Sequence, residues 1–259
     1  MYLTAVQSSI QPMHRSASHP AQALQICDVK ACRSRCHLRA WCKSAYPNDL
    51  HAGLGIAGEA LVFGRRQVHA GQILYREGQK LECLFEVRSG NLKSSLSTAN
   101  GQERVTGFHM SGDLLGLDGV ASGHHVITVT ALEDTEVCTM SYARLASLAQ
   151  GNAELQHSLM RLMGQEIVRE LRLVVLLASM NAEERLANFL LGLSGQMAER
   201  GYSPSDFHMR MTRADIGSYL GLSLETVSRT FSALQRLDFL DVHQRHIRIT
   251  DMAGLAGRQ

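Results

Sequence analysis

The sequence lacks a long apolar run and a strong net charge. No segment approaches the roughly 18 consecutive apolar residues of a membrane-spanning helix, and the first twenty residues have no continuous apolar stretch after a charged one, as a secretory signal would. We therefore expect a cytoplasmic protein without a membrane partner. The formal net charge is only +2, so any surface that attracts nucleic acid has to be local.

The chain also lacks a CxxC pair, the spacing typical of structural zinc sites. Four of its six cysteines nevertheless fall within sixteen residues: Cys27, Cys32, Cys36 and Cys42. In a cytoplasmic chain such clusters more often bind metal or sense redox state than form structural disulfides, and the basic neighbours favour the thiolate form. Three close thiolates and one distant thiolate would suit a 4Fe-4S cluster. Zinc is the second interpretation, and a disordered basic tail with incidental cysteines is another.

The segment 153–178 is predicted to form one long helix. It contains no proline and a single glycine, and it is long enough for about seven helical turns. Intervals of three and four residues define a heptad seam, which predicts a parallel two-helix dimer. The seam comprises Gln156, Met160, Met163, Ile167, Glu170, Val174 and Leu177. A leucine stripe on another face would pack on the helix's own domain, and a helix buried inside a monomer is the alternative.

One seam residue, Glu170, is a carboxylate. Across a two-fold axis it would lie near its own copy, and like charges in a partly dry interface oppose association. We therefore expect a weak dimer that a signal can strengthen.

Residues 68–142 alternate between short β-favouring runs and turn markers such as Asn100-Gly101. Six runs predict a small antiparallel roll or barrel. They are 72–75, 83–89, 92–97, 103–109, 126–131 and 136–140. Cys138, in the last run, is the thiol best placed to act as a distant fourth ligand. The adjacent His124 and His125 are expected to diverge on a loop rather than to bind a metal together.

The C-terminal region carries the signals of several capped helices. Asn181 is a predicted N-cap that follows a hinge at 179–181. Thr212, with Asp215 three residues later, predicts a helix start, and Ser223 caps the next helix after a tight turn at Gly221. Two short helices joined in this way predict a helix-turn-helix. A helix pair packed inside an α-domain is the alternative.

The second helix of such a motif enters the major groove of DNA by its N-terminal residues. Those residues are Glu225, Thr226, Ser228 and Arg229, and their side chains can read base edges. The following run VHQRHIRIT reads as a wing, in which Arg245 and Arg248 are available for phosphates.

Characteristic stretches run along the chain: VTGFHMSGDLLGLD, ALEDTEVC, LMRLMGQEI, NAEERLANFLLGLS, RGYSPSDFHMRMTRADIGSYLGL and LETVSR. Over about residues 68–250 they resemble the FNR branch of the CRP/FNR family of bacterial transcription regulators. The resemblance implies an α+β architecture with a cyclic-nucleotide-binding-like β-roll, a long dimerisation helix and a winged helix-turn-helix. We accordingly expect five segments: a mobile arm 1–26, a cysteine segment 27–45, the β-roll 46–152, the dimerisation helix 153–180 and the DNA-binding domain 181–259.

The resemblance also implies site residues and partners. It implies an oxygen-labile 4Fe-4S cluster on three N-terminal cysteines and one in the roll, a TTGAT half-site in double-stranded DNA, a homodimer and contact with RNA polymerase. By position, Glu225, Ser228 and Arg229 match the family's base-reading residues, and Cys138 matches the roll cysteine. The region 116–131 contains no arginine, where members that bind cyclic nucleotides carry one, so no cyclic nucleotide is expected.

The cysteine spacing departs from the family. Family members commonly begin with CxxC, whereas this chain has Cys32-xxx-Cys36-xxxxx-Cys42. One extra residue moves a ligand by up to about 3.5 Å, which a flexible loop can absorb. The preferred ligand set is Cys32, Cys36, Cys42 and Cys138, with Cys27 as an alternate.

We therefore expect a transcription regulator of low-oxygen gene expression, an activator or a repressor, whose cluster controls dimerisation. The alternative is the same regulator with a thiol/disulfide or zinc switch. An enzyme is not expected, because the chain has no convincing constellation of base and nucleophile.

Overall fold

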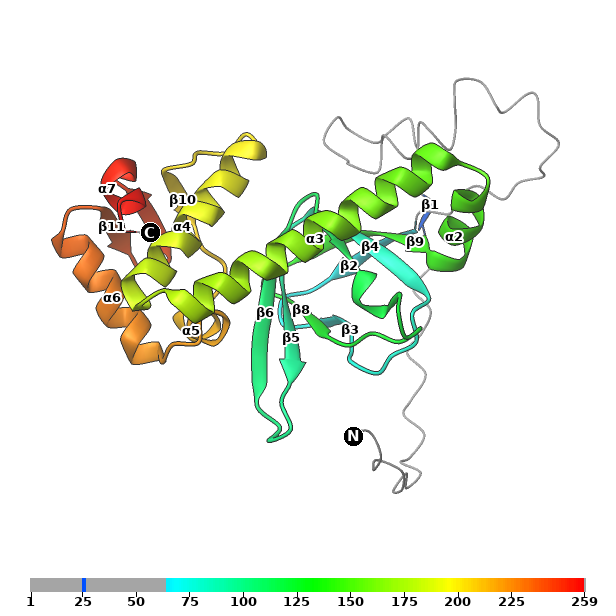
Figure 1. The fold of residues 1–259 in the computed structure, drawn as a ribbon, viewed down its shortest axis with the longest axis horizontal. Coiled ribbons are helices and arrows are strands. Elements are labelled where there is room, and N and C mark those ends of the chain that lie inside the picture. The colour runs from blue at the N-terminus through cyan, green and yellow to red at the C-terminus, as the bar shows by residue number, and fades with distance from the viewer. Residues whose placement is uncertain (1–24, 27–63, 259) are drawn as a thin grey trace.

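The computed structural model describes residues 25–26 and 64–258 (Figure 1). The N-terminal cysteines Cys27, Cys32, Cys36 and Cys42, and with them the predicted segment 27–45, lie outside the described residues. The described chain forms a β-roll, a long helix that leaves it, and a C-terminal domain of helices and a small sheet.

The roll consists of two antiparallel sheets, with strand orders β1-β2-β9-β4-β7 and β3-β8-β5-β6. The first contains β1 (Gln25–Ile26), β2 (Gly64–Val68), β4 (Cys83–Ser89), β7 (Leu114–Leu115) and β9 (Thr135–Ser141). The second contains β3 (Ile73–Tyr75), β5 (Asn91–Ser97), β6 (Glu103–Met110) and β8 (Thr128–Ala131). Alternate residues of the strands meet in a core that fully buries Tyr75, Leu92 and Val129. All six predicted strands are confirmed within two residues at either end.

Two helices follow the roll, and the first was not predicted. It is α2 (Tyr142–Gln150), and the second is α3 (Ala153–Ser179), which confirms the predicted long helix. The Asn152 side chain caps α3 by accepting the Leu155 N–H at 2.9 Å. Leu155 and its neighbours on the leucine stripe pack on α2 and the roll, as the stripe predicted. None of the described helices is both long and apolar enough to cross a membrane.

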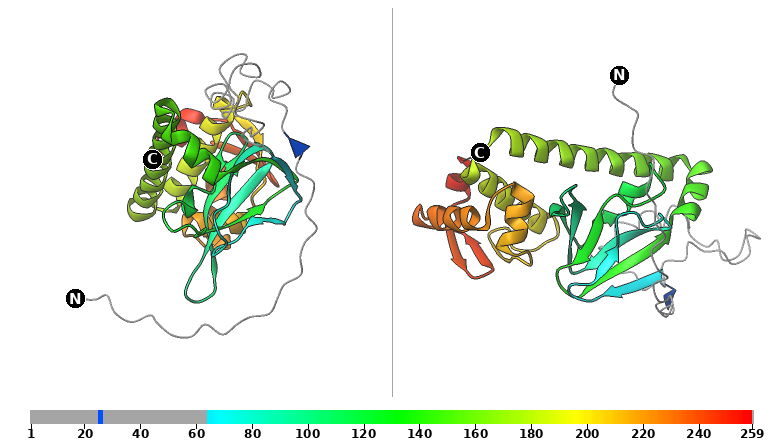
Figure 2. Two further views of the ribbon diagram at one scale, coloured as in Figure 1. Left: turned by 90° about the vertical axis from the view of Figure 1, so that its right-hand side faces the viewer. Right: turned by 90° about the horizontal axis from the view of Figure 1, so that it is seen from below.

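The opposite side of α3 is apolar and exposed. Figure 2 (right) shows the roll and the C-terminal domain on one side of α3, with the other side open. Large apolar side chains on the helix are 48 to 64% exposed: Met160, Ile167, Val168, Leu171, Val174 and Val175. Of the predicted seam, Met163 and Leu177 are only half-exposed. The exposed stripe is thus rotated slightly from that seam and places Glu170 at its edge.

The C-terminal domain begins with α4 (Ala182–Glu199). It continues with β10 (Asp206–His208), α5 (Arg213–Leu220), α6 (Leu224–Arg236), β11 (Leu240–His243), β12 (His246–Ile249) and α7 (Met252–Ala256). The strands form a sheet of order β10-β12-β11. Leu186, Ile216, Phe231 and Ile247 meet in the core, and Met110 at the end of β6 joins this core from the roll. The two domains therefore share apolar contacts.

Candidate nucleic-acid interface and metal centre

The two helices α5 and α6 form the predicted helix-turn-helix. The Thr212 hydroxyl accepts the Asp215 N–H at 3.1 Å, while the Asp215 carboxylate accepts the Thr212 N–H at 2.8 Å, which completes a capping box. Gly221 ends α5 with φ +66°, a left-handed conformation that favours glycine. The Ser223 hydroxyl then caps α6 by accepting the Thr226 N–H at 3.0 Å. All three sequence predictions for this motif are confirmed.

Packing fixes the angle between α5 and α6. A Cβ at Gly217 would lie 2.7 Å from the Leu222 carbonyl oxygen, so only glycine allows this close crossing of backbones. Val227 and Phe231 of α6 are buried below the turn. The two helices are therefore closely packed on each other through Gly217 and Val227.

The N-terminal part of α6 presents polar residues to solvent. Glu225 and Arg229 are exposed, while Thr226 and Ser228 are half-exposed. These are the side chains predicted to read bases, and all four lie on the open side of the domain core. Sequence reasoning missed Leu224, which is 56% exposed beside Glu225. Its exposure could not be read from sequence, since a leucine at the start of a helix usually suggests core.

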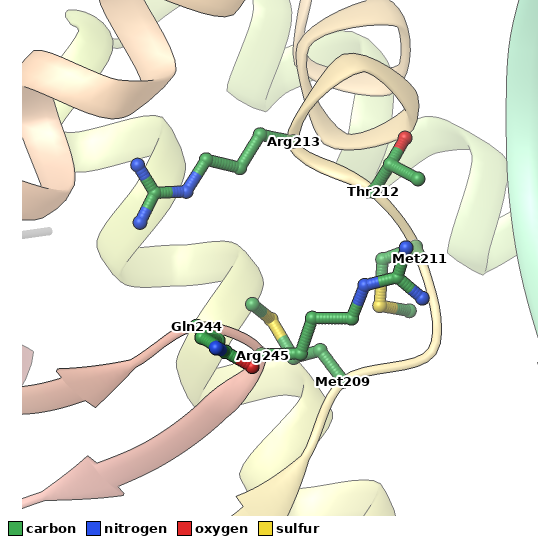
Figure 3. A pocket seen from close by; sticks show the side chains of 6 residues that line it. All are labelled: Met209, Met211, Thr212, Arg213, Gln244 and Arg245. Atoms are coloured by element: carbon green, nitrogen blue, oxygen red, sulfur yellow. The ribbon is translucent and has the colours of Figure 1, made fainter.

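A pocket beside α5 holds two arginines that lie on different elements (Figure 3). Arg213 begins α5, with its guanidinium carbon 5.3 Å from the centre of the Phe231 ring. Arg245 lies in the turn between β11 and β12, and donates to the Arg210 carbonyl oxygen at 3.2 Å. Met209, Met211, Thr212 and Gln244 complete the lining. The two guanidinium groups extend toward opposite sides of the hollow in Figure 3, so each is available to a different anion such as a phosphate. Sequence reasoning identified only Arg245.

The predicted phosphate contact Arg248 is already engaged. Its Nε lies 3.1 Å from the Asp206 carboxylate, which also receives the His246 ring at 2.6 Å. The hydrogen bond from His246, then that from Arg248, lowers the pKa of the Asp206 carboxyl. A phosphate at Arg248 would therefore compete with Asp206.

The predicted roll ligand Cys138 is a buried residue of β9, and its side chain is packed with Leu84, Met140 and Leu145. In the sheet register Cys138 pairs with Arg65, which in turn pairs with Gln25 of β1. At about 4.8 Å per strand, β1 lies about 10 Å from Cys138. β1 ends at Ile26, directly before the predicted cysteine segment. Within residues 25–26 and 64–258, no group of three or more metal-ligating side chains occurs.

The two adjacent histidines do not converge on a metal. The His125 ring stacks on Tyr75 with 3.8 Å between ring centres, and its Nδ1 lies 3.3 Å from the Asp118 carboxylate. Asp118 also accepts the Tyr75 hydroxyl at 3.2 Å. His124 instead contacts its own turn at Ser122. The expectation that the pair diverges is confirmed.

A third histidine, His109, is buried between the roll and α3. Its Nε2 lies 2.9 Å from the Ser94 hydroxyl, while its Nδ1 has no hydrogen-bond partner. Burial, and to a smaller extent the positive charge of Arg169, lowers the pKa of His109 to about 3. The ring is therefore neutral at physiological pH.

Aromatic rings and ion pairs join the two domains. Phe108 of β6, Phe189 of α4 and Tyr219 of α5 form a cluster whose ring centres are 5.3 to 5.8 Å apart. Arg200, at the end of α4, pairs with Asp113 at 2.8 Å. Sequence reasoning missed this interface, since no local pattern shows which surface residues of two domains meet.

Two family models match the chain. The cyclic nucleotide-binding domain matches residues 65–152, and the Crp-like helix-turn-helix domain matches residues 184–258. The fumarate and nitrate reduction regulatory protein of Salmonella typhimurium is 42% identical over 196 residues, which cover 74% of this chain and 78% of that protein. Its counterpart in Escherichia coli K12 is 42% identical over 192 residues, covering 74% and 77%.

Solved structures show the same fold. FixK2 from Bradyrhizobium japonicum superposes with a TM-score of 0.71 at 28% identity, over 77% of this chain and 98% of that one. A CRP-family transcriptional regulator from Thermus thermophilus superposes with a TM-score of 0.60 at 17% identity, over 74% and 95%. The second likeness concerns the fold alone.

Proposed function

Since this chain belongs to the CRP/FNR family and is a DNA-binding transcription regulator of anaerobic genes, not an enzyme, we propose that it senses oxygen through a 4Fe-4S cluster. Cys138 would supply one ligand from the roll, and Cys32, Cys36 and Cys42 would supply the others, with Cys27 as an alternate. Such a cluster, when bound, supplies a centre that oxygen destroys. The supporting observation is that β1, which leads into the cysteine segment, lies two strands from Cys138 in one sheet.

On DNA, the recognition helix α6 would read a palindrome of TTGAT half-sites. Arg229 suits the O6 and N7 atoms of guanine, and Glu225 can accept from the cytosine amino group. Thr226 and Ser228 lie beside them on the same exposed face. Arg213 and Arg245, which line the pocket between α5 and the wing, would each contact a backbone phosphate.

The regulator would act as a homodimer that forms along α3. The exposed apolar stripe on this helix is the kind of surface that a second copy covers, and two recognition helices are needed for a palindrome. RNA polymerase would be the further partner at the promoter, in the cytoplasm.

The decisive experiment compares two cysteine variants. Anaerobically reconstituted wild-type protein should hold about four iron and four sulfide per subunit, and Cys138→Ser should lose most of both. Cys83→Ser is the matched control, because Cys83 is a half-buried thiol on the neighbouring strand β4. Burial, and then the charge of Glu82, raises the pKa of the Cys83 thiol. Iron and sulfide analysis and the visible spectrum before and after air provide the readout.

The same measurement addresses the alternative. If wild-type protein contains stoichiometric zinc and no sulfide, the regulator uses a zinc switch and not a cluster. A metal-free protein whose DNA binding responds to dithiol reagents would indicate a thiol/disulfide switch.

A further inference from the structure

The first helix of the helix-turn-helix, α5, docks on the β5–β6 hairpin of the roll. Lys93 Nζ of β5 lies 2.8 Å from the Asp215 carboxylate, and the Val105 N–H of β6 donates to the Ser218 hydroxyl at 2.9 Å. These contacts lie beside the aromatic cluster that includes Phe108. The roll thus holds α5 along its length.

The Lys93–Asp215 pair is largely withdrawn from water. The side chains are 20% and 12% exposed, so removing one charge leaves the other poorly solvated. Burial alone would raise the pKa of the Asp215 carboxyl, but hydrogen bonds from Lys93 and Thr212 hold it below its usual value. The two carboxylate oxygens of Asp215 have different partners, since Oδ1 accepts a hydrogen bond from Lys93 and Oδ2 accepts one from Thr212. Changing Lys93 therefore leaves the cap of α5 in place.

A second attachment holds the other end of the unit. Arg185 donates to the Leu177 carbonyl oxygen at the end of α3 and to the Leu220 carbonyl oxygen at the end of α5, at 2.8 and 3.0 Å. With one end tied to α3, the contact at Lys93 limits how α5 can rotate about that end, together with the Ser218 hydrogen bond and the aromatic cluster at Phe108. Because α6 is packed closely on α5, the same contact helps to fix where α6 lies.

We propose that Lys93 is a positioning residue for DNA binding, which holds α5 and α6 at a fixed place relative to α3 and so sets the half-site spacing that the dimer accepts. This inference rests on the proposed binding of a palindrome by a dimer. Two recognition helices that are rigidly placed require one spacing, because half-sites lie about one helical turn apart. Helices released from the roll should tolerate other spacings.

The test uses TTGAT palindromes whose half-sites are separated by the preferred spacer, or by one base pair more or less. Wild-type protein should bind the preferred spacing best. In the Lys93→Glu variant the new carboxylate repels Asp215, so the protein should bind the preferred site about tenfold more weakly than wild type does. Changing the spacer by one base pair should then reduce the affinity of the variant much less than it reduces the affinity of wild type. Binding to an isolated half-site should be unchanged, because α6 itself is intact.

Three further variants make the result specific. Lys80→Glu makes the same charge change at an exposed position of the roll and should keep the wild-type spacing profile. Lys93→Arg should restore it, and Ser218→Ala, which removes the acceptor of the Val105 N–H without harming α5, should relax it partly. A wild-type profile in both Lys93→Glu and Ser218→Ala, or parallel losses for Lys93→Glu and Lys80→Glu on all DNA, would overturn the inference. Failure of wild-type protein to prefer any palindrome would instead overturn the proposed function.

Discussion

The Arg200 guanidinium lies 2.8 Å from the Asp113 carboxylate, across the boundary between the C-terminal domain and the roll. Its Nε also donates to the Ser111 carbonyl oxygen at 2.6 Å, and both side chains of the pair are at most 20% exposed. A partly buried charge that loses its partner destabilises the fold. The pair therefore joins the C-terminal domain to the roll, in addition to the contacts of β5 and β6 with α5 and the aromatic cluster at Phe108.

Asp113→Asn should lower the free energy of unfolding by about 1 to 3 kcal/mol, because Arg200 keeps its position but loses the opposite charge. Urea denaturation followed by circular dichroism measures this difference. Asp134→Asn is the control, since Asp134 forms an exposed pair with His69, and it should leave the midpoint unchanged. Equal midpoints for wild type and Asp113→Asn would show that the pair contributes nothing to stability.

Acid should destabilise the protein through His109. Its pKa is about 3 in the folded chain, against about 6.5 in the unfolded chain. Between these two pH values the ring is protonated in the unfolded chain and neutral in the folded chain. Above pH 6.5 the ring is neutral in both states and the free energy of unfolding does not depend on it. As the pH falls from 6.5 toward 3, the free energy of unfolding decreases by up to about 1.4 kcal/mol per pH unit. His109→Gln should flatten the dependence of unfolding free energy on pH between 7 and 5. His208→Gln, at an exposed position, should keep the wild-type slope.

Local chemistry made much of the fold predictable. Caps at Asn181, Thr212 and Ser223 are short-range hydrogen-bonding signals, and each was confirmed. The six strands of the roll were visible because turn residues separate them. Helix α2 was missed because its sequence, YARLASLAQ, is short and has only one fully buried side chain, Leu145, so its apolar period is weak.

The site was predictable where it depends on one element and not where it depends on several. The four base-reading candidates share the first turns of α6, whereas Arg213 and Arg245 come together only because the wing folds beside α5. The offset between the exposed apolar stripe of α3 and the predicted seam could not be seen in the sequence. Heptad spacing fits more than one register, and only packing against the roll exposes Leu171 in place of Met163.

Base-reading and phosphate-binding arginines should differ in their response to sequence and salt. Arg229→Ala should cost on the order of 1 to 3 kcal/mol on a TTGAT palindrome and little on random DNA. Arg245→Ala should weaken both alike and lower the salt slope by about 0.9 per phosphate contact. Arg248→Ala should do so less, because Arg248 already pairs with Asp206. Fluorescence anisotropy over a salt series measures all three, and equal losses on both DNAs would remove Arg229 from the base-reading set.

The last prediction concerns Glu170, at the edge of the exposed stripe of α3. Burial, and then the charge of Glu166, raises the pKa of its carboxyl even in one chain, against the opposing effect of Arg169. The ionised form is thus already disfavoured, and a second copy nearby would disfavour it further. Protonation relieves this cost, so association of the cluster-free protein should strengthen as the pH falls from neutral through the raised pKa.

The Glu170→Ala variant should form dimers without the cluster. Relief of about 1 to 3 kcal/mol would raise the association constant roughly 5- to 150-fold, and alanine also favours the helix. We expect the variant to dimerise and to bind DNA in air, with little dependence on pH. Glu166→Gln is the matched control, because it removes a charge one turn away and keeps an oxygen for its partner Arg169. Sedimentation of aerobic protein decides the matter, since a Glu170→Ala population identical to wild type would mean that the carboxylate does not face its copy.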